Sequence, residues 1–502
     1  MTQPPAHAAP APEALSPSTL TVLRTLTVAA FVVILNETVL VNALPPLMDS
    51  LHVDERAVQW LSTGFMLTLA VVIPTTGWLL QRLGTRGAFR LAMSLFLLGT
   101  TINLLAPTFT ILLIGRVVQA SGTAVMMPLL MTTLLTLVPP NARGRVMGNV
   151  TLAMSVAPAL GPAVSGIVLQ FLGWRWLFAL VLPIALAVFL LGSRGLRAAG
   201  IPEPSGPRPR LDGLSVLLSA VGFGALVYGL AEVGGAGSRS GSAPLSPAPI
   251  ALVVGALGLA LFVWRQLSLQ RRSTPLLDLR VLSHRPYAVA VALCSVAFMA
   301  LMGVMILLPL YLQNVRGLSV LQTGLLLMPG GLAMGLMGPR VGRWFDRIGA
   351  RRLVIPGAFM VLVALAGLVA STLGAPWWSF LLCHVVASIG LALMFTPMFT
   401  GGLASLPPHL YPFGSAMIGS VQQVAAAAGT ALSIAVLSWR QSAILADGAP
   451  AVEALDGGVR AALVVGVVLA VVVAGIALLV RDPAPEARDE DEQERHTAAS
   501  LG

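Results

Sequence analysis

Glu37 is the one acidic residue inside a long apolar run, Thr21 to Pro46, and it is the first candidate for chemistry in this chain. At about 1.5 Å of rise per residue, roughly 20 helical residues cross the hydrocarbon core of a bilayer. Glu37 should therefore lie near the midplane or in the outer half of a membrane helix. An acid at such depth costs about 3 kcal/mol even on lenient scales, and it persists mostly where it faces water or a partner. We favour a working carboxyl group over the alternative, a protonated and hydrogen-bonded structural residue.

Arg116 is the only basic side chain deep in an apolar run of the N-terminal half. A buried guanidinium needs an acid or several acceptors nearby, so the sequence predicts an interaction between Arg116 and Glu37. Burial and a neighbouring positive charge act on the protonation of a carboxyl group in opposite directions, and wetting the site from either side changes their balance. Such a group suits proton coupling. The alternative is that Arg116 satisfies backbone carbonyls and braces the helices.

The composition places these two residues in a polytopic membrane protein. Of the 502 residues, 56% are hydrophobic and 10% are charged, whereas ordinary soluble domains carry about 25% charged residues. The first apolar run is too long for a cleavable signal peptide. The net charge of +10 comes from arginines that lie mostly between spans, which fits the positive-inside rule better than nucleic-acid binding. Cys294 and Cys383 fall within apolar runs, so neither a disulfide nor a metal site is expected.

Fourteen apolar segments are long enough to cross a bilayer as helices. The loops that follow even-numbered segments are rich in arginine and the opposite loops are poor in it, so both termini are expected in the cytoplasm of a cell-membrane protein. The expected spans are 21–46, 57–80, 89–107, 109–137, 146–170, 176–193, 211–233, 248–268, 286–312, 320–343, 352–373, 377–404, 412–438 and 460–480.

An internal repeat divides these spans into two halves. GWLLQRLGTRG, Gly77 to Gly87, returns as GRWFDRIGARR, Gly342 to Arg352, and LLIGRVVQASG returns as FLLCHVVASIG. We call Gly77 to Gly87 the first inside loop and Gly342 to Arg352 the second inside loop. His384 occupies the repeat position of Arg116 and is either a relay group or, as we favour, a structural hydrogen-bonding residue. The copies lie on one side of the membrane, which indicates parallel halves around a midplane cavity, as in secondary transporters. The expected division is a disordered N-terminus at 1–18, six helices at 19–198, two inserted helices at 199–275, six helices at 276–481 and a disordered acidic tail at 482–502.

The chain resembles the major facilitator superfamily, and within it the fourteen-helix drug:proton antiporter branch, over about residues 20 to 481. ILNETVLVNALP resembles the first-helix signature of that branch, with Asn36 where an Asp is common. The two inside loops, the run from Arg116 to Gly122, Ala159 to Pro162 with Gly166, Trp174 to Trp176, and Gly414 to Ala416 with Gln422 and Gln423 resemble further motifs in the same order. The resemblance implies an all-α membrane fold of two six-helix bundles plus two central helices. It also implies a monomer that uses the proton gradient, without a cofactor.

The inside loops are expected to latch the cytoplasmic side while the site faces outward. Glycine permits tight turns and close helices, and Arg or Asp at helix ends can pair with charges and helix dipoles. The alternative is that the arginines only anchor the topology. Gln81 stands where the family has Asp, so the first latch should be weaker than the second. The expected latch residues are Gly77, Arg82, Gly84 and Arg86, and then Gly342, Asp346, Arg347, Gly349 and Arg351.

The fifth span and a set of amides and methionines complete the candidates. Prolines kink a helix and glycines allow close packing, so a bend and a packing seam are expected at Pro158, Gly161, Pro162 and Gly166, the antiporter motif in the family. Amides offer donors and acceptors, and methionines adapt to apolar ligands. The candidate lining residues are Asn36, Asn42, Gln119, Met126, Met127, His384, Gln422 and Gln423.

These patterns favour a proton-coupled exporter of hydrophobic drugs or metabolites, cationic ones included. No nucleotide-binding loop, zincin signature or nucleophile triad is present in the sequence, so an enzyme or an ATP-driven pump is not supported. One alternative changes the cargo to a self-made antibiotic, lipid or peptide. Another is an uncoupled facilitator or a receptor, which would not require Glu37 and Arg116 inside apolar helices.

Overall fold

The computed structural model describes residues 16–40, 43–198, 211–236, 247–270 and 275–482, and these residues form helices joined by short turns. Of the tail expected at 482–502, only Asp482 is described, and it is ordered against α12 (Arg351–Ser371); residues 483–502, most of the expected N-terminal segment and Asn42 lie outside the described residues. The helices are α1 (Pro17–Val39), α2 (Leu44–Leu51), α3 (Glu55–Val72), η2 (Ile73–Thr75), α4 (Thr76–Leu105), α5 (Phe109–Leu137), η3 (Pro140–Ala142), α6 (Arg143–Phe171), α7 (Arg175–Ala198), α8 (Gly213–Ala236), α9 (Pro247–Gln270), η4 (Leu279–Ser283), α10 (Arg285–Asn314), α11 (Val320–Ile348), α12 (Arg351–Ser371), α13 (Trp377–Ala404), η5 (Pro408–Leu410), α14 (Tyr411–Ala446) and α15 (Ala451–Ala477).

Among the described residues, thirteen helical stretches are long and apolar enough to cross a membrane. One of them, Ala57–Leu105, contains two crossings, because the chain reverses at Gly84, where φ is 66° and ψ is 176°. The fourteen predicted spans are therefore recovered. The last span was misplaced, since α15 begins at Ala451 instead of residue 460. Its first turns carry Asp456 and Arg460, which pair at 2.7 Å and extend the helix beyond its apolar part.

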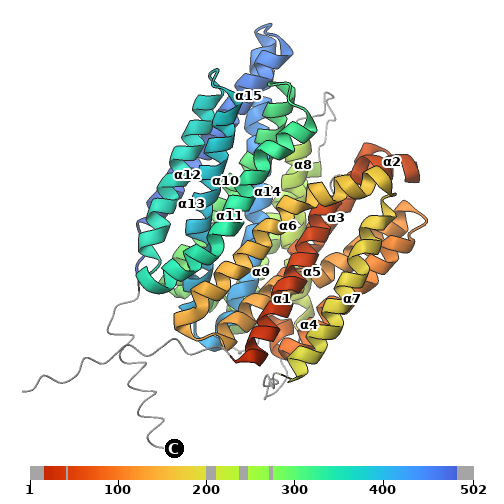
Figure 1. Cartoon of the computed structure of the whole chain (residues 1–502), viewed down its shortest axis with the longest axis vertical. Helices are drawn as coiled ribbons and strands as arrows, with labels where there is room; N and C mark the ends of the chain where they lie inside the picture. Colours follow the sequence, from red (N-terminus) through yellow and green to blue (C-terminus); the bar gives the residue numbers. More distant parts are fainter. Residues whose placement is uncertain (1–15, 41–42, 199–210, 237–246, 271–274, 483–502) are drawn as a thin grey trace, which may run out of the picture.

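Two bundles make up the molecule, as the resemblance implied (Figure 1). In the first, α1 packs on α5, α6 and α7, and α4 packs on α5 and α7; in the second, α10 packs on α13, α14 and α15, and α12 packs on α13 and α15. The inserted helices α8 and α9 pack against each other, and α8 contacts α3 and α14. Trp60 of α3 stacks on Tyr228 of α8 with ring centroids 6.0 Å apart. The domain boundaries themselves stay a prediction.

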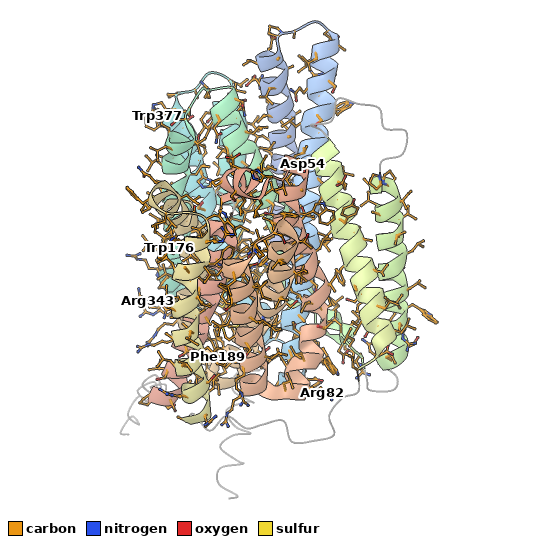
Figure 2. All side chains as sticks on the ribbon, turned by 90° about the vertical axis from the view of Figure 1, so that its right-hand side faces the viewer. Asp54, Arg82, Trp176, Phe189, Arg343 and Trp377 are labelled. Carbon is orange, nitrogen blue, oxygen red and sulfur yellow. The ribbon has the colours of Figure 1, made fainter. Side chains whose placement is uncertain are left out.

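The two inside loops lie at the same end of the molecule, which we call the inside-loop end. Figure 2 shows Arg82 near this lower end, whereas Asp54 and Trp377 lie toward the opposite end. The second inside loop turns at Gly349 with φ 81° and ψ 179°, nearly the conformation of Gly84. Both turns need a positive φ that glycine adopts without a Cβ clash. The repeat found in the sequence is thus a repeat in backbone geometry.

The bundles meet most closely where α6 crosses α11. A Cβ added to Gly148 would lie 2.8 Å from the backbone carbon of Gly338, and one added to Gly331 would lie 3.2 Å from Ala159. Farther from the inside-loop end, a Cβ on Gly166 or Gly324 would meet no atom within 4 Å. In Figure 1 the ribbons of α6 and α11 likewise converge at the lower end and separate toward the upper end. The bundles are therefore closed at the inside-loop end and diverge at the other.

Candidate functional site

Arg116 is buried inside the first bundle, with 2% of its surface exposed. Its Nη1 donates a hydrogen bond of 2.8 Å to Oε1 of Gln119, one turn along α5. The guanidinium carbon lies 4.1 Å from the centroid of the Phe65 ring of α3. A desolvated cation over an aromatic face gains about 2 kcal/mol. Phe65, which the sequence analysis missed, therefore helps to hold the charge in place.

An amide network between α4 and α5 fixes the partner of this arginine. Gln119 Nε2 donates to Thr100 Oγ1 at 2.8 Å, and Asn103 Nδ2 donates to Gln119 Oε1 at 3.3 Å. Gly99 and Gly115 bring the two helices together, since a Cβ on Gly99 would lie 2.6 Å from the Gly115 carbonyl oxygen. Both amide atoms of Gln119 are hydrogen-bonded, whereas Oδ1 of Asn103 is buried without a partner among the described residues. Gln119 thus positions Arg116 and is itself positioned by α4.

Glu37 lies two residues before the end of α1, about 30 Å of helix from its first residue. It is half-buried and interacts electrostatically with Arg116, but no oxygen of Glu37 comes within 4.0 Å of that guanidinium among the described residues. The expected interaction is therefore electrostatic and not a salt bridge, and the printed contacts of the guanidinium are with Gln119 and Phe65. Within the described chain, Arg116 Nε and Asn36 Oδ1 are buried without a hydrogen-bond partner. The site therefore has one free hydrogen-bond donor and one free acceptor near the half-buried carboxyl group of Glu37.

The predicted seam on α6 packs beside this carboxyl group. A Cβ on Gly161 would lie 2.8 Å from Cβ of Thr38, the residue that follows Glu37. Gly161 therefore lets α6 approach α1 at the level of the acid. Gly166 faces open space and Pro158 is exposed, so the seam is confined to part of the motif. The side chain of Pro162 lies outside what the structure describes.

The other candidate lining residues differ in how far they are buried. Gln119 and Met126 are buried within helix packing, while Met127, Gln422 and Gln423 are half-buried. His384 lies in the second bundle, where a Cβ on Gly330 would be 2.9 Å from Ser388 and still closer to the imidazole. Their contacts with a substrate stay predictions. Of the set, Asn36 and Gln119 are the ones that share a region with Glu37 and Arg116.

The second inside loop is joined to the first bundle through Asp346. Its carboxylate accepts hydrogen bonds from the backbone N–H groups of Gly144 and Arg145, both at 2.8 Å, at the first turn of α6. In the first inside loop, Gln81 Nε2 reaches the carbonyl oxygen of His409 at 3.5 Å. Arg82 lies 5.4 Å from the Trp78 ring centroid, Arg86 borders a small cavity, and Arg347 and Arg351 are exposed.

Two further carboxylates form hydrogen bonds at helix ends, and neither contact was predicted from the sequence. Asp482 accepts from the N–H groups of Ala350 and Arg351 at 2.6 and 3.1 Å and so caps α12. Asp212 accepts two hydrogen bonds from Arg265, at 2.8 and 2.9 Å, and ties α8 to α9. The bonded guanidinium holds the pKa of Asp212 at about 2, well below its usual range.

No group of three or more His, Cys, Asp or Glu residues in the described part of the chain could hold a metal ion. The arrangement instead offers a half-buried acid, a buried guanidinium held by Gln119, and two bundles that are in contact at the inside-loop end.

Comparisons with known proteins agree with this fold. A relative named lincomycin resistance protein LmrB from Listeria monocytogenes is 38% identical over 92% of this chain and 96% of its own length. A multidrug resistance protein B homolog from Mycobacterium tuberculosis is 32% identical over 77% of this chain and 70% of its own length. The structure of the human organic anion transporter MFSD10 superposes with a TM-score of 0.65 at 16% identity, covering 92% of this chain and all of that one. Since the model of the Major Facilitator Superfamily matches residues 26–430, this chain belongs to that family and is a multi-pass membrane transporter.

Proposed function

We propose that this protein exports hydrophobic drugs or metabolites across the cell membrane in exchange for protons, as a monomer that works by alternating access. The observation that carries the proposal is Glu37. It is a half-buried acid in a membrane helix, and it lies in the field of a buried arginine that does not pair with it directly. Ionisable residues inside the membrane are functional-site candidates by default, and proton relays are one of the functions they serve. The names of the relatives, which refer to lincomycin and multidrug resistance, support a drug as cargo.

The geometry of Arg116 suits a carboxyl group that gains and loses its proton. A direct salt bridge would keep Glu37 ionised, whereas an apolar site without a cation would keep it protonated. Here the guanidinium of Arg116 donates to Gln119 and lies over the Phe65 ring, so its charge acts on Glu37 without a direct contact. Small changes in hydration then decide whether the proton is bound. Gly161 on α6 lies next to this acid through Thr38, so movement of α6 changes its surroundings.

The conformation described here fits the outward-facing stage of such a cycle. The positive-inside rule places the inside-loop end in the cytoplasm, together with both termini. The bundles are in contact at that end and diverge around Gly166 and Gly324. Glu37, near the outer end of α1, then lies on the open side, where a proton can enter as the substrate leaves.

Transport into everted vesicles tests the coupling. With an imposed pH gradient, we expect uptake of a fluorescent cationic dye that a protonophore abolishes. Glu37→Gln should remove gradient-driven uptake by at least about 100-fold while leaving insertion intact. Glu453→Gln, which removes an exposed acid at the start of α15, is the matched control and should keep full uptake. Uptake that survives the protonophore, or that Glu37→Gln leaves unchanged, would contradict proton coupling and favour a facilitator.

Expression in a drug-sensitive host tests the cargo. Raised resistance to several chemically different hydrophobic drugs, lost on Glu37→Gln, is the expected outcome. Unchanged susceptibility across a broad panel, with dye transport intact in vesicles, would favour a dedicated cargo such as a self-made antibiotic, lipid or peptide.

A further inference from the structure

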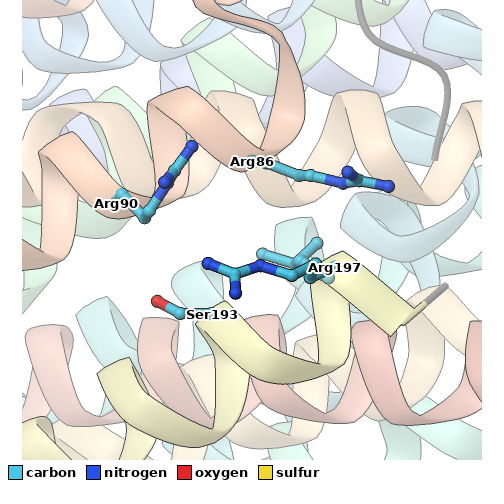
Figure 3. A pocket seen from close by; sticks show the side chains of 5 residues that line it. Arg86, Arg90, Ser193 and Arg197 are labelled. Carbon is cyan, nitrogen blue, oxygen red and sulfur yellow. The ribbon is translucent and has the colours of Figure 1, made fainter. Parts of the chain in front are cut away.

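A small cavity lies between α4 and α7 near the inside-loop end. Its volume is about 100 Å³, and it is lined by Arg86, Arg90, Ser193, Leu196 and Arg197. Figure 3 shows Arg86 and Arg90 on α4 facing Arg197 and Ser193 on α7, with the Arg197 guanidinium reaching over Ser193 into the space between the helices. A single water needs roughly 10–15 Å³ of such space, so the cavity has room for a group several times larger.

The cavity collects positive charge that the described protein does not balance. Three of its five lining residues are arginines and none is acidic. Within the described residues, no salt bridge joins any of these arginines to a carboxylate. Arg86 is half-buried, whereas Arg90 and Arg197 are exposed. Like charges that converge repel one another unless an anion lies between them. The arrangement therefore calls for a negatively charged occupant.

Unpartnered donors at the same place point to an oxygen-rich anion. Among the described residues, Nε of Arg86 and Oγ of Ser193 are buried and have no hydrogen-bond partner. A buried donor without a partner costs about 1–3 kcal/mol, so such atoms usually have an unseen partner. Guanidinium and hydroxyl groups together match the geometry of phosphate oxygens. A phosphate group would satisfy both atoms and neutralise the cluster.

We propose that this cavity binds the phosphate of an anionic phospholipid from the adjacent leaflet. The helix faces that carry the cluster continue toward the membrane interior as exposed apolar surface. Leu190 and Leu186 lie one and two turns from Ser193 and are each 46% exposed, and Leu98 lies two turns from Arg90 and is 54% exposed. Acyl chains can lie along these leucines while the headgroup occupies the cavity, an arrangement known for basic pockets between membrane helices. A free phosphate ion would use the arginines and Ser193 but would leave these leucines uncovered.

The site has a structural consequence for the first inside loop. Arg86 follows the Gly84 turn by two residues, so a bound phosphate would tether that turn to α7. Which leaflet supplies the lipid rests on the orientation proposed above, in which the inside-loop end faces the cytoplasm. The binding chemistry does not depend on that orientation or on proton coupling.

Native mass spectrometry of the purified full-length protein tests the assignment. Protein in detergent is titrated with dioleoyl phosphatidylglycerol, with dioleoyl phosphatidylcholine, or with inorganic phosphate. We expect the protein to retain one phosphatidylglycerol molecule tightly and to retain phosphatidylcholine much more weakly. Arg90→Gln with Arg197→Gln should weaken phosphatidylglycerol retention roughly 30-fold, at about 1 kcal/mol for each arginine. Arg24→Gln with Arg194→Gln removes the same charge from exposed positions outside the cavity, and it should change retention less than about threefold.

Each other result would overturn the proposal. Equal retention by the cavity variant and the wild type would show that the cavity holds no lipid. Equal losses in both double variants would show unspecific attraction to charge. Binding of inorganic phosphate that matches phosphatidylglycerol, lost in the cavity variant, would show a free-anion site instead of a lipid site. The thermal stability of each variant in phosphatidylcholine shows whether it is folded. If the double variant of Arg90 and Arg197 does not fold, Arg197→Gln alone is used in its place.

Discussion

The two inside loops share one backbone turn but hold the opposite bundle by different means. Gly84 and Gly349 both have positive φ and nearly extended ψ, and each follows a helix that packs against the other bundle. The turn is therefore set by the repeated glycine and not by what surrounds it. What differs is the side chain three residues before the glycine, which is Gln81 in the first copy and Asp346 in the second.

The difference at this position changes the kind of contact with the opposite bundle. Asp346 places a carboxylate at the first turn of α6, where two unsatisfied N–H groups and the positive end of the helix dipole meet it. Gln81 offers a neutral donor to one carbonyl at 3.5 Å, the outer limit of a hydrogen bond. Charge-assisted bonds are about twice as strong as neutral ones. The comparison predicts that the second copy contributes most of the closure at the inside-loop end.

The largest effect should come from glycines at the bundle interface. A Cβ at Gly342 would overlap the Gly144 carbonyl group, and backbone cannot move aside cheaply, whereas a Cβ at Gly77 would meet the Phe413 ring at 2.7 Å. We expect Gly342→Ala to cost about 3 kcal/mol of stability and Gly77→Ala about 1 kcal/mol, since a ring can rotate away. Thermal unfolding in detergent measures both. Equal losses at the two positions would contradict the asymmetry.

Removing the charge of Asp346 should have the next largest effect. Asp346→Asn keeps the shape but loses the anion and one acceptor, so we expect the closed arrangement to lose about 2 kcal/mol, roughly a 30-fold shift in its ratio to the open one. Spin labels at Arg145 and Arg347, both exposed near this contact, report the distance between α6 and α11. Asp456→Asn breaks a pair on the opposite side of the molecule and is the matched control. An unchanged distance distribution in Asp346→Asn would show that the carboxylate does not hold the bundles together.

The spans, the repeat and Glu37 could all be predicted because each depends on local pattern. Apolar length reveals a membrane helix, and an acid inside it stands out against a uniform background. The turn at Gly84 was predictable since the glycine and arginine spacing recurs at Gly349. The family resemblance added the order of the helices. None of these inferences requires knowledge of which side chains touch.

The partner of Arg116 could not be predicted because it depends on the register between α4 and α5. Thr100 and Asn103 read as ordinary polar residues in an apolar helix, and Phe65 as ordinary packing. The advance signal lay in glycines such as Gly99, Gly115 and Gly122, which allow the two helices to approach closely. The cap of α12 by Asp482 was equally hidden, because the two segments are 131 residues or more apart in the chain.

Removing the charge of Asp212 should have a smaller effect on stability than removing that of Asp346. The Asp212–Arg265 pair joins α8 to α9 and does not join the two bundles, so it serves as a reference for Asp346. The pKa of Asp212 is about 2 when folded, below that of an unpaired Asp at about 3.8. The pair with Arg265 therefore stabilises the fold fully above about pH 4, and this contribution is lost as the pH falls toward 2. We expect Asp212→Asn to remove at most about 1 kcal/mol at pH 7, because the pair is partly exposed. Thermal melts between pH 2 and pH 7 should show a difference from wild type that shrinks on acidification; a difference that grows would contradict the assignment.

Giving the first inside loop the acid that it lacks should produce the smallest effect. In Gln81→Asp the carboxylate cannot donate to the His409 carbonyl oxygen. We expect it to face the first turn of α14, where one N–H group is missing because residue 412 is a proline. The dipole at that helix start contributes about 0.3–1 kcal/mol, so the closed arrangement should gain less than about fivefold. Gln81→Ala, which loses only the 3.5 Å contact, should leave the label distances near their wild-type values. If Gln81→Ala opens the inside-loop end as far as Asp346→Asn does, the two loops carry equal shares of the closure, and the exchange of one acid for an amide does not explain their difference.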